Sequence, residues 1–83
     1  MSDQPIVGEL MLWAGPRIPG GWERADGRLL RIMEYQMLFT LIGDRFGGDG
    51  RQTFALPDVQ KDAQANKGLT WCIAVDGVYP SFP

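Results

Sequence analysis

Residues 43–59, GDRFGGDGRQTFALPDV, hold four glycines, three aspartates and two arginines within seventeen positions. Residues of these types build several kinds of functional loop. Gly-rich loops bind phosphate through backbone N–H groups, and loops rich in Gly and Asp bind calcium through carboxylates. A pair of aspartates can also act as acid and base in glycosidase-type hydrolysis. The spacing of these residues decides among these three chemistries and a structural role.

Neither phosphate nor calcium binding fits this spacing. A P-loop lies between a strand and a helix and ends in Gly-Lys-Ser/Thr, whereas Arg51-Gln52 stand here in place of Lys and Ser/Thr. An EF-hand loop needs acidic ligands at alternate positions and a bidentate Glu at its twelfth position. Asp44 and Asp49 are five residues apart, with Phe46 between them and no Glu downstream. We therefore expect no metal ion and no other cofactor here.

Acid–base catalysis by Asp49 and Asp58 is the third possibility, and it would make the protein a small hydrolase. No feature of the sequence indicates a raised pKa or a pocket around them. The chain has no histidine, the usual general base and the commonest metal ligand. Its one cysteine, Cys72, lies in the apolar run 69–75, which predicts a buried thiol without a disulfide. We predict that the protein is not an enzyme.

The structural alternative gives the residues of this stretch backbone roles. Gly43 ends a helix, residues 47–50 reverse the chain, and a short strand over 53–56 stops at a proline. The aspartates, Asp44 among them, then accept hydrogen bonds from neighbouring N–H groups. The residues of this structural motif are Gly43, Gly47, Gly48, Asp49, Gly50, Phe54, Leu56, Pro57 and Asp58.

The remaining elements predict an α+β fold, in which a small, mostly antiparallel sheet of short strands and hairpins packs against one helix of about three turns. Strands are expected over 6–14 and, at the centre of the sheet, over 69–75. Asp-Gly pairs at 26–27 and 76–77 predict two hairpin turns. The helix spans 33–42 and buries the stripe Met37, Leu38, Leu41 and Ile42.

Both faces of the strand over 6–14 are apolar, which bears on partners. Leu10, Leu12 and Ala14 share one face, and Met11 and Trp13 share the other. A small sheet buries one face in its own core, so we expect the Met11/Trp13 face to contact a helix, a loop or another chain.

Length and charge restrict the function further. A chain of 83 residues makes a single domain over 1–83, and its net charge of −2 comes from interspersed charges without a basic patch. Neither nucleic acid nor an anionic membrane is therefore the expected partner. No apolar stretch reaches eighteen residues, and the first residues, MSDQP, show no signal-peptide pattern.

The order of these features resembles the phage tail collar domain, which is found in phage short tail fibres and in bacterial microcystin-dependent proteins. The specific part is Gly-Gly-Asp-Gly at 47–50 followed by Thr-Phe-x-Leu-Pro-Asp at 53–58. The resemblance covers a collar core over about 7–60 and, after a polar linker over about 60–67, a closing segment over 68–80. It implies a non-enzymatic component of a virion or phage-tail-like particle, assembled in the bacterial cytoplasm.

Three departures from the family pattern limit what carries over. Ala25 replaces the cysteine that usually precedes Asp-Gly, and Met33 replaces the Ser-like residue that opens the helix. After Asp58, the long Gly-rich, His-containing region of tail fibres is absent. In tail fibres that region is associated with trimer intertwining, metal ligation and receptor contact, so no metal site is carried over.

Two functions remain as hypotheses. The first is a structural module that acts as a homo-oligomer, a trimer by the resemblance, or that attaches to other tail proteins. The second is a carbohydrate-recognition module in which an exposed tryptophan (Trp13, Trp22 or Trp71) stacks on cell-surface glycans during host attachment. The candidate contact residues for either function are Met11, Trp13, Trp22, Tyr79 and Phe82.

Overall fold

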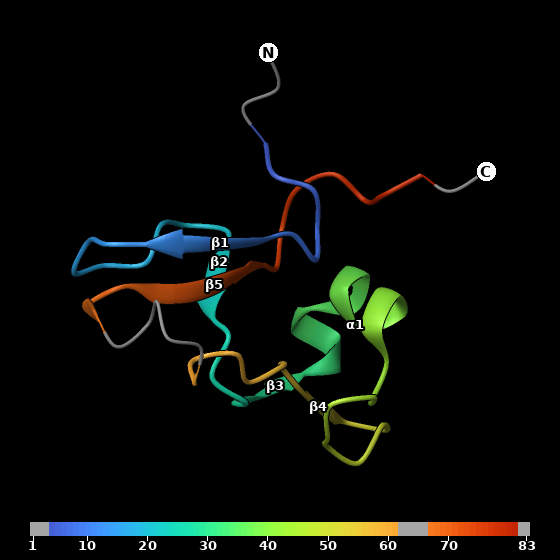
Figure 1. The fold of residues 1–83 in the computed structure, drawn as a ribbon. Helices are drawn as coiled ribbons and strands as arrows, with labels where there is room; N and C mark the ends of the chain where they lie inside the picture. Colours follow the sequence, from blue (N-terminus) through green and yellow to red (C-terminus); the bar gives the residue numbers. More distant parts are fainter. Residues whose placement is uncertain (1–3, 62–66, 82–83) are drawn as a thin grey trace.

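The computed structural model describes residues 4–61 and 67–81, which form two small antiparallel sheets and a single α-helix (Figure 1). The predicted α+β class is confirmed. Strands β1 (Leu10–Trp13), β5 (Thr70–Ala74) and β2 (Trp22–Arg24) form the larger sheet in that spatial order. Strands β3 (Leu29–Arg31) and β4 (Thr53–Ala55) form the smaller one. Phe82, a predicted contact residue, lies outside the described residues.

The central position predicted for the closing strand is confirmed. β5 pairs antiparallel with β1 on one side and with β2 on the other. Its residues Cys72, Ile73 and Ala74 are at most 2% exposed, although they alternate between the two faces of the sheet. Apolar residues in succession were the right signal, because a strand covered on both faces gains from apolar side chains at every position.

Each face of the larger sheet has a different cover. Ile73 belongs to the core, and its register partners Leu10 and Glu23 lie on the same face of the sheet but outside the core cluster. Neighbouring residues along a strand point to opposite faces, so Cys72 and Trp13 lie on the other face. There the indole N–H of Trp13 donates to the main-chain oxygen of Arg17, 2.7 Å away, in the loop that connects β1 to β2. A loop was among the expected partners of this face.

Both predicted Asp-Gly hairpins are wrong. β2 and β3 flank Asp26-Gly27, but they join different sheets, and only Gly27 of this pair has a positive φ, at 84°. A type I′ turn needs positive φ at both central residues. After Asp76-Gly77 the chain does not return along β5. Val78 forms an isolated parallel bridge with Ile6, so tertiary pairing with the N-terminal segment replaces the local turn.

The helical segment is divided in two. A 3₁₀ turn, η1 (Ile32–Glu34), precedes the helix α1 (Gln36–Ile42), and Tyr35 between them has φ −134° and ψ 49°. Neither N-terminus has a side-chain cap, which agrees with the poor start signal at Met33. Gly43 ends α1 with φ 61°, and its N–H donates to Phe39 O at 2.7 Å.

One hydrophobic core joins the two sheets and the helix. Leu38 of α1 and Phe54 of β4 are completely buried. The rings of Phe54 and Phe39 pack edge to face, with their centroids 5.4 Å apart. The core cluster consists of Val7, Ala25, Leu38, Phe54, Leu56, Ile73 and Val75. It holds residues of α1, β4 and β5, and therefore fixes these three elements relative to one another. Among the described residues, no helix is long and apolar enough to cross a membrane.

Candidate functional site

The turn that leads into β4 is organised by the carboxylate of Asp49. Its Oδ1 accepts three main-chain N–H bonds, at 2.9, 2.9 and 3.0 Å, from Arg51, Gln52 and Thr53. These bonds stabilise the charged form and lower the pKa of Asp49 to about 2. The N–H of Gly50 donates to Thr53 O at 2.9 Å and closes the turn. The carboxylate thus has the role of a backbone staple.

The position before Asp49 requires a glycine. Gly48 has φ 88°, and a Cβ at this position would lie 2.5 Å from the Cα of Phe54. The backbone of the turn therefore lies directly against β4. Gly47 contributes through its carbonyl oxygen, which accepts the N–H of Ala55 at 3.0 Å.

The other predicted motif residues also have structural positions. Leu56 is 1% exposed, Pro57 is half-buried, and Asp58 forms an antiparallel bridge with Asp26. The carboxylate of Asp58 accepts the N–H of Gln60 at 3.3 Å. Asp44 contributes its main-chain oxygen, which accepts the N–H of Gly47 at 3.0 Å.

The two aspartates considered for catalysis do not converge. Asp49 is bonded to Thr53 at the start of β4, whereas Asp58 lies three residues beyond the end of that strand. Five residues of mostly extended chain span roughly 15 Å, more than the roughly 5–10 Å between the carboxyl groups of glycosidases. A general acid also needs a raised pKa, and that of Asp49 is lowered. Within the described part of the chain, no group of three or more Cys, Asp or Glu side chains could hold a metal ion.

A polar network joins β2, the following loop and Tyr35, which lies between η1 and α1. The guanidinium of Arg28 lies 3.0 Å from Asp26 Oδ1 and 3.2 Å from Glu23 Oε1. Its hydrogen bond lowers the pKa of Asp26, and Asp26 in turn raises the pKa of Arg28. The hydroxyl of Tyr35 donates to Glu23 Oε2 at 3.4 Å, and burial followed by the charge of Glu23 raises the pKa of Tyr35. The network fixes Glu23 and Tyr35 at the edge of a surface hollow.

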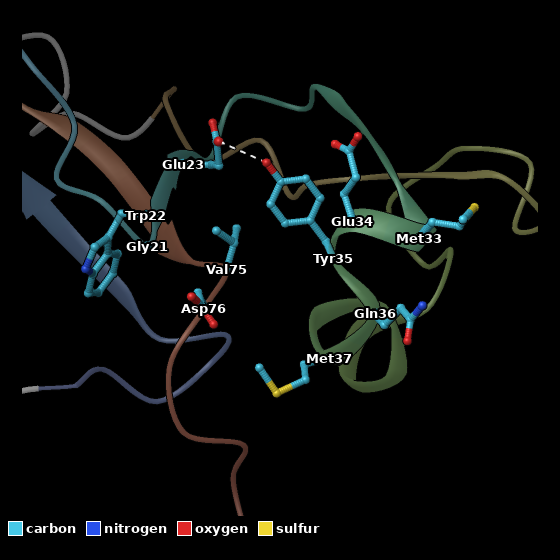
Figure 2. Close-up of a pocket in the computed structure, with 10 residues that line it drawn as sticks. All are labelled: Gly21, Trp22, Glu23, Met33, Glu34, Tyr35, Gln36, Met37, Val75 and Asp76. Carbon is cyan, nitrogen blue, oxygen red and sulfur yellow. Dashed lines mark hydrogen bonds between the residues drawn. The ribbon is translucent and has the colours of Figure 1, made fainter.

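This hollow of about 570 Å³ lies between the β2–β5 side of the larger sheet and the η1–α1 segment (Figure 2). Three acidic residues, Glu23, Glu34 and Asp76, are among those that line it. Tyr35 adds an aromatic ring. The lining residues are Gly21, Trp22, Glu23, Met33, Glu34, Tyr35, Gln36, Met37, Val75 and Asp76.

Tyr35, rather than a tryptophan, is the aromatic ring directed toward the hollow. In Figure 2 the indole of Trp22 points away from Tyr35. The strand register agrees, because Trp22 and Glu23 are neighbours on β2 and face opposite sides of the sheet. Sequence reasoning did not select Tyr35, since nothing in its local pattern distinguishes it from a core aromatic.

The strand register places three of the predicted contact residues, Met11, Trp13 and Trp22, on the same face of the larger sheet. Met11, Trp13 and Trp22 are half-buried, and Trp13 is bonded to the loop after β1. Tyr79, next to the bridge of Val78 with Ile6, is 39% exposed. Trp71 packs against the core.

Gln60 is a structural residue that sequence reasoning missed. Its side-chain amide donates to the oxygens of Ala25 and Trp71, at 3.1 and 2.7 Å, and its carbonyl accepts the N–H of Trp71 at 3.2 Å. The polar run 60–67 predicted a linker beginning at this residue. Local sequence could not reveal its partners, because they are 35 and 11 positions away. It joins Ala25, directly after β2, to Trp71 of β5.

Comparison with known proteins places this arrangement in a family. A search of curated proteins finds no match. The family model of the phage tail collar domain matches residues 8–63, a stretch that begins two residues before β1, continues past Gln60 and includes the Asp49 turn. The match covers more than half of the 83 residues. The chain belongs to the phage tail collar domain family.

Proposed function

We propose that this chain is a non-enzymatic assembly module of a phage tail fibre or phage-tail-like particle, acting by self-association or by attachment to other tail subunits. Family membership indicates a structural module of phage tails and a virion component. The proposal adds the mode of action. It also includes assembly in the bacterial cytoplasm.

The observation that carries the proposal is the number of large apolar side chains left exposed on so small a domain. Each of the following is at least 37% exposed, with Met33 reaching 84%: Ile6, Leu10, Leu12, Leu29, Met33, Met37, Phe46, Val78 and Tyr79. Single exposed apolar residues are ordinary, but contiguous patches mark interaction surfaces. Ile6 and Val78 are bridge partners, with Tyr79 adjacent, and Leu10 and Leu12 share one face of β1. Burial of these groups in an assembly would remove apolar surface from water.

Sedimentation of the purified chain tests the proposal. We expect species larger than the 9.2 kDa monomer, or a complex when tail proteins of the same particle are added. A stable monomer that binds none of these proteins would contradict the proposal. A trimer, which the family resemblance implies, would show that this short form keeps the symmetry of tail fibres.

Carbohydrate recognition is the second candidate, and the hollow favours it. An aromatic ring stacks on the apolar face of a sugar, and carboxylates accept hydrogen bonds from its hydroxyls. Tyr35, Glu23 and Asp76 supply these groups at an open site. Glycan-array binding that is lost in Tyr35→Leu and kept in Trp22→Ala would support this candidate. An array without hits would remove it.

A further inference from the structure

The two edges of the three-stranded sheet are protected unequally. β2 forms one edge and carries the charged residues Glu23 and Arg24. β1 forms the other edge, and its sequence Leu-Met-Leu-Trp has neither a charge nor a proline. Charged side chains and prolines are the usual means by which proteins prevent edge strands from pairing with other chains. The β1 edge has neither of these protections.

The register identifies the main-chain groups that face outward from β1. Ala74 donates to Glu9 O at 2.8 Å and accepts from Gly8 N–H at 2.9 Å, so Ala74 is a hydrogen-bonded position of the β1–β5 ladder. Bonded and non-bonded positions alternate in antiparallel pairs, so Met11, opposite Cys72, is bonded to β5. The N–H and C=O groups of Leu10 and Leu12 therefore point toward the free edge. No main-chain partner for them occurs within residues 4–61 and 67–81.

The side chains of the same two leucines are also exposed. Leu10 is 43% and Leu12 37% exposed, whereas Ile73, beside Leu10 on the same face, is 2% exposed. Among the described residues, the core cluster includes Ile73 but no residue of β1. Thus apolar side chains and unpaired backbone donors and acceptors occur together along one strand edge.

We propose that β1 pairs antiparallel with β1 of a second copy about a twofold axis. Leu10 then lies opposite the partner's Leu12, and the reverse pair follows by symmetry, which gives four N–H···O=C bonds. The Leu-Met-Leu pattern reads the same in both directions, so this edge complements itself. The two sheets become one continuous sheet, and the exposed leucines of each copy cover those of the other.

The inference rests on the proposed function, since it assigns the surface through which the chain associates with itself. A twofold contact produces a dimer. The trimer implied by the family resemblance would need a different, threefold contact.

A disulfide placed on the proposed axis tests the register. Met11 would lie opposite the partner's Met11 in a non-hydrogen-bonded pair, where Cα atoms are about 4.5 Å apart, a separation that a disulfide spans. The native thiol is removed by Cys72→Ala. In that background Met11→Cys should form a disulfide-linked dimer under mild oxidation. Arg24→Cys, at the other edge of the sheet, is the matched control and should remain unlinked.

A charge at the same edge provides the second measurement. Leu12→Lys brings two ammonium groups to the paired strands and should weaken dimerisation at least tenfold by sedimentation. Ala14→Lys, at an exposed position on the same face just beyond β1, should change it less than threefold. Circular dichroism verifies that each variant is folded.

The outcomes separate the two proposals. A chain that self-associates although Met11→Cys does not link and Leu12→Lys has no effect overturns the edge pairing and leaves the proposed function standing. Formation of a trimer would likewise overturn the edge pairing and leave the proposed function standing. A chain that is monomeric at all concentrations and cannot be linked through Met11→Cys overturns the edge pairing, and only binding to other tail proteins would then support the proposed function.

Discussion

The Asp49 turn and the free edge of β1 differ in whether their backbone hydrogen-bonding groups have partners within the chain. In the turn, one carboxylate oxygen accepts three N–H groups, and Thr53 O accepts a fourth, from Gly50. At the edge, the N–H and C=O groups of Leu10 and Leu12 have no main-chain partner within the described residues. Both segments are short and lie at the surface.

This difference separates a structural site from the interaction site that we propose. A turn in which the N–H groups of residues 49–53 are bonded internally offers little to a ligand, although its residues are the most diagnostic in the sequence. An edge with unpaired donors and acceptors and with exposed leucines is stabilised when a second strand pairs with it. The most recognisable residues of this chain and those best suited to contact a partner are therefore different.

The largest expected effect is at the closed turn. Gly48→Ala would place a Cβ 2.5 Å from Phe54 Cα at a φ of 88°, so the turn must separate from β4. We expect a loss of about 3 kcal/mol in the free energy of unfolding, measured by urea denaturation. Gly20→Ala, with no heavy atom within 4 Å of the new Cβ and no positive φ, is the matched control. Equal stability of the two variants would show that the turn can open without cost.

The next effect concerns Gln60, whose side chain links Ala25 to Trp71 of β5. Gln60→Ala removes three hydrogen bonds and takes from the N–H of Trp71 its acceptor, while the oxygens of Ala25 and Trp71 each keep one main-chain donor. We expect a loss of about 2 kcal/mol on urea denaturation. Gln52→Ala at an exposed position should cost less than about 0.5 kcal/mol. A urea midpoint equal to that of the wild type in Gln60→Ala would mean that water replaces the three hydrogen bonds of Gln60 without loss of stability.

A smaller, pH-dependent effect belongs to the Asp49 staple. Its pKa in the folded chain is about 2, below the usual 3.8, so its charged form stabilises the fold above pH 3.8. This contribution is lost as the pH falls from 3.8 toward 2. Asp49→Asn should therefore lower the melting temperature at pH 7, and the difference from wild type should shrink at pH 2. A difference that is constant from pH 7 to 2 would show that charge has no part in the staple.

The smallest effect on stability is expected at the open edge. Leu12→Lys changes a side chain that is 37% exposed and outside the core cluster. The free energy of unfolding of the monomer should change by less than about 0.5 kcal/mol, measured at a concentration below dimerisation. A loss comparable to that of Gly48→Ala would mean that Leu12 belongs to the core, and the contrast between the two regions would fail.

Local pattern was sufficient where neighbours in sequence are also neighbours in space. The Asp49 turn, the end of the helix at Gly43 and the short strand before Pro57 were all predicted correctly. The centre of the sheet was also predicted, because residues 69–75 are apolar on both faces. The surface hollow was not, since Glu23, Tyr35 and Asp76 come from separate segments and meet only through folding.

The sequence by itself determined the α+β class, the collar motif and the burial of Cys72, because each depends on short-range spacing, apolar patterning or glycine geometry. Only the tertiary structure decided that β2 and β3 join different sheets, that Gln60 holds β5, and that β1 keeps a free edge. The pairing of a strand depends on which distant segments bury its apolar face in the folded chain. Two-residue periodicity predicts a strand but does not identify its neighbour.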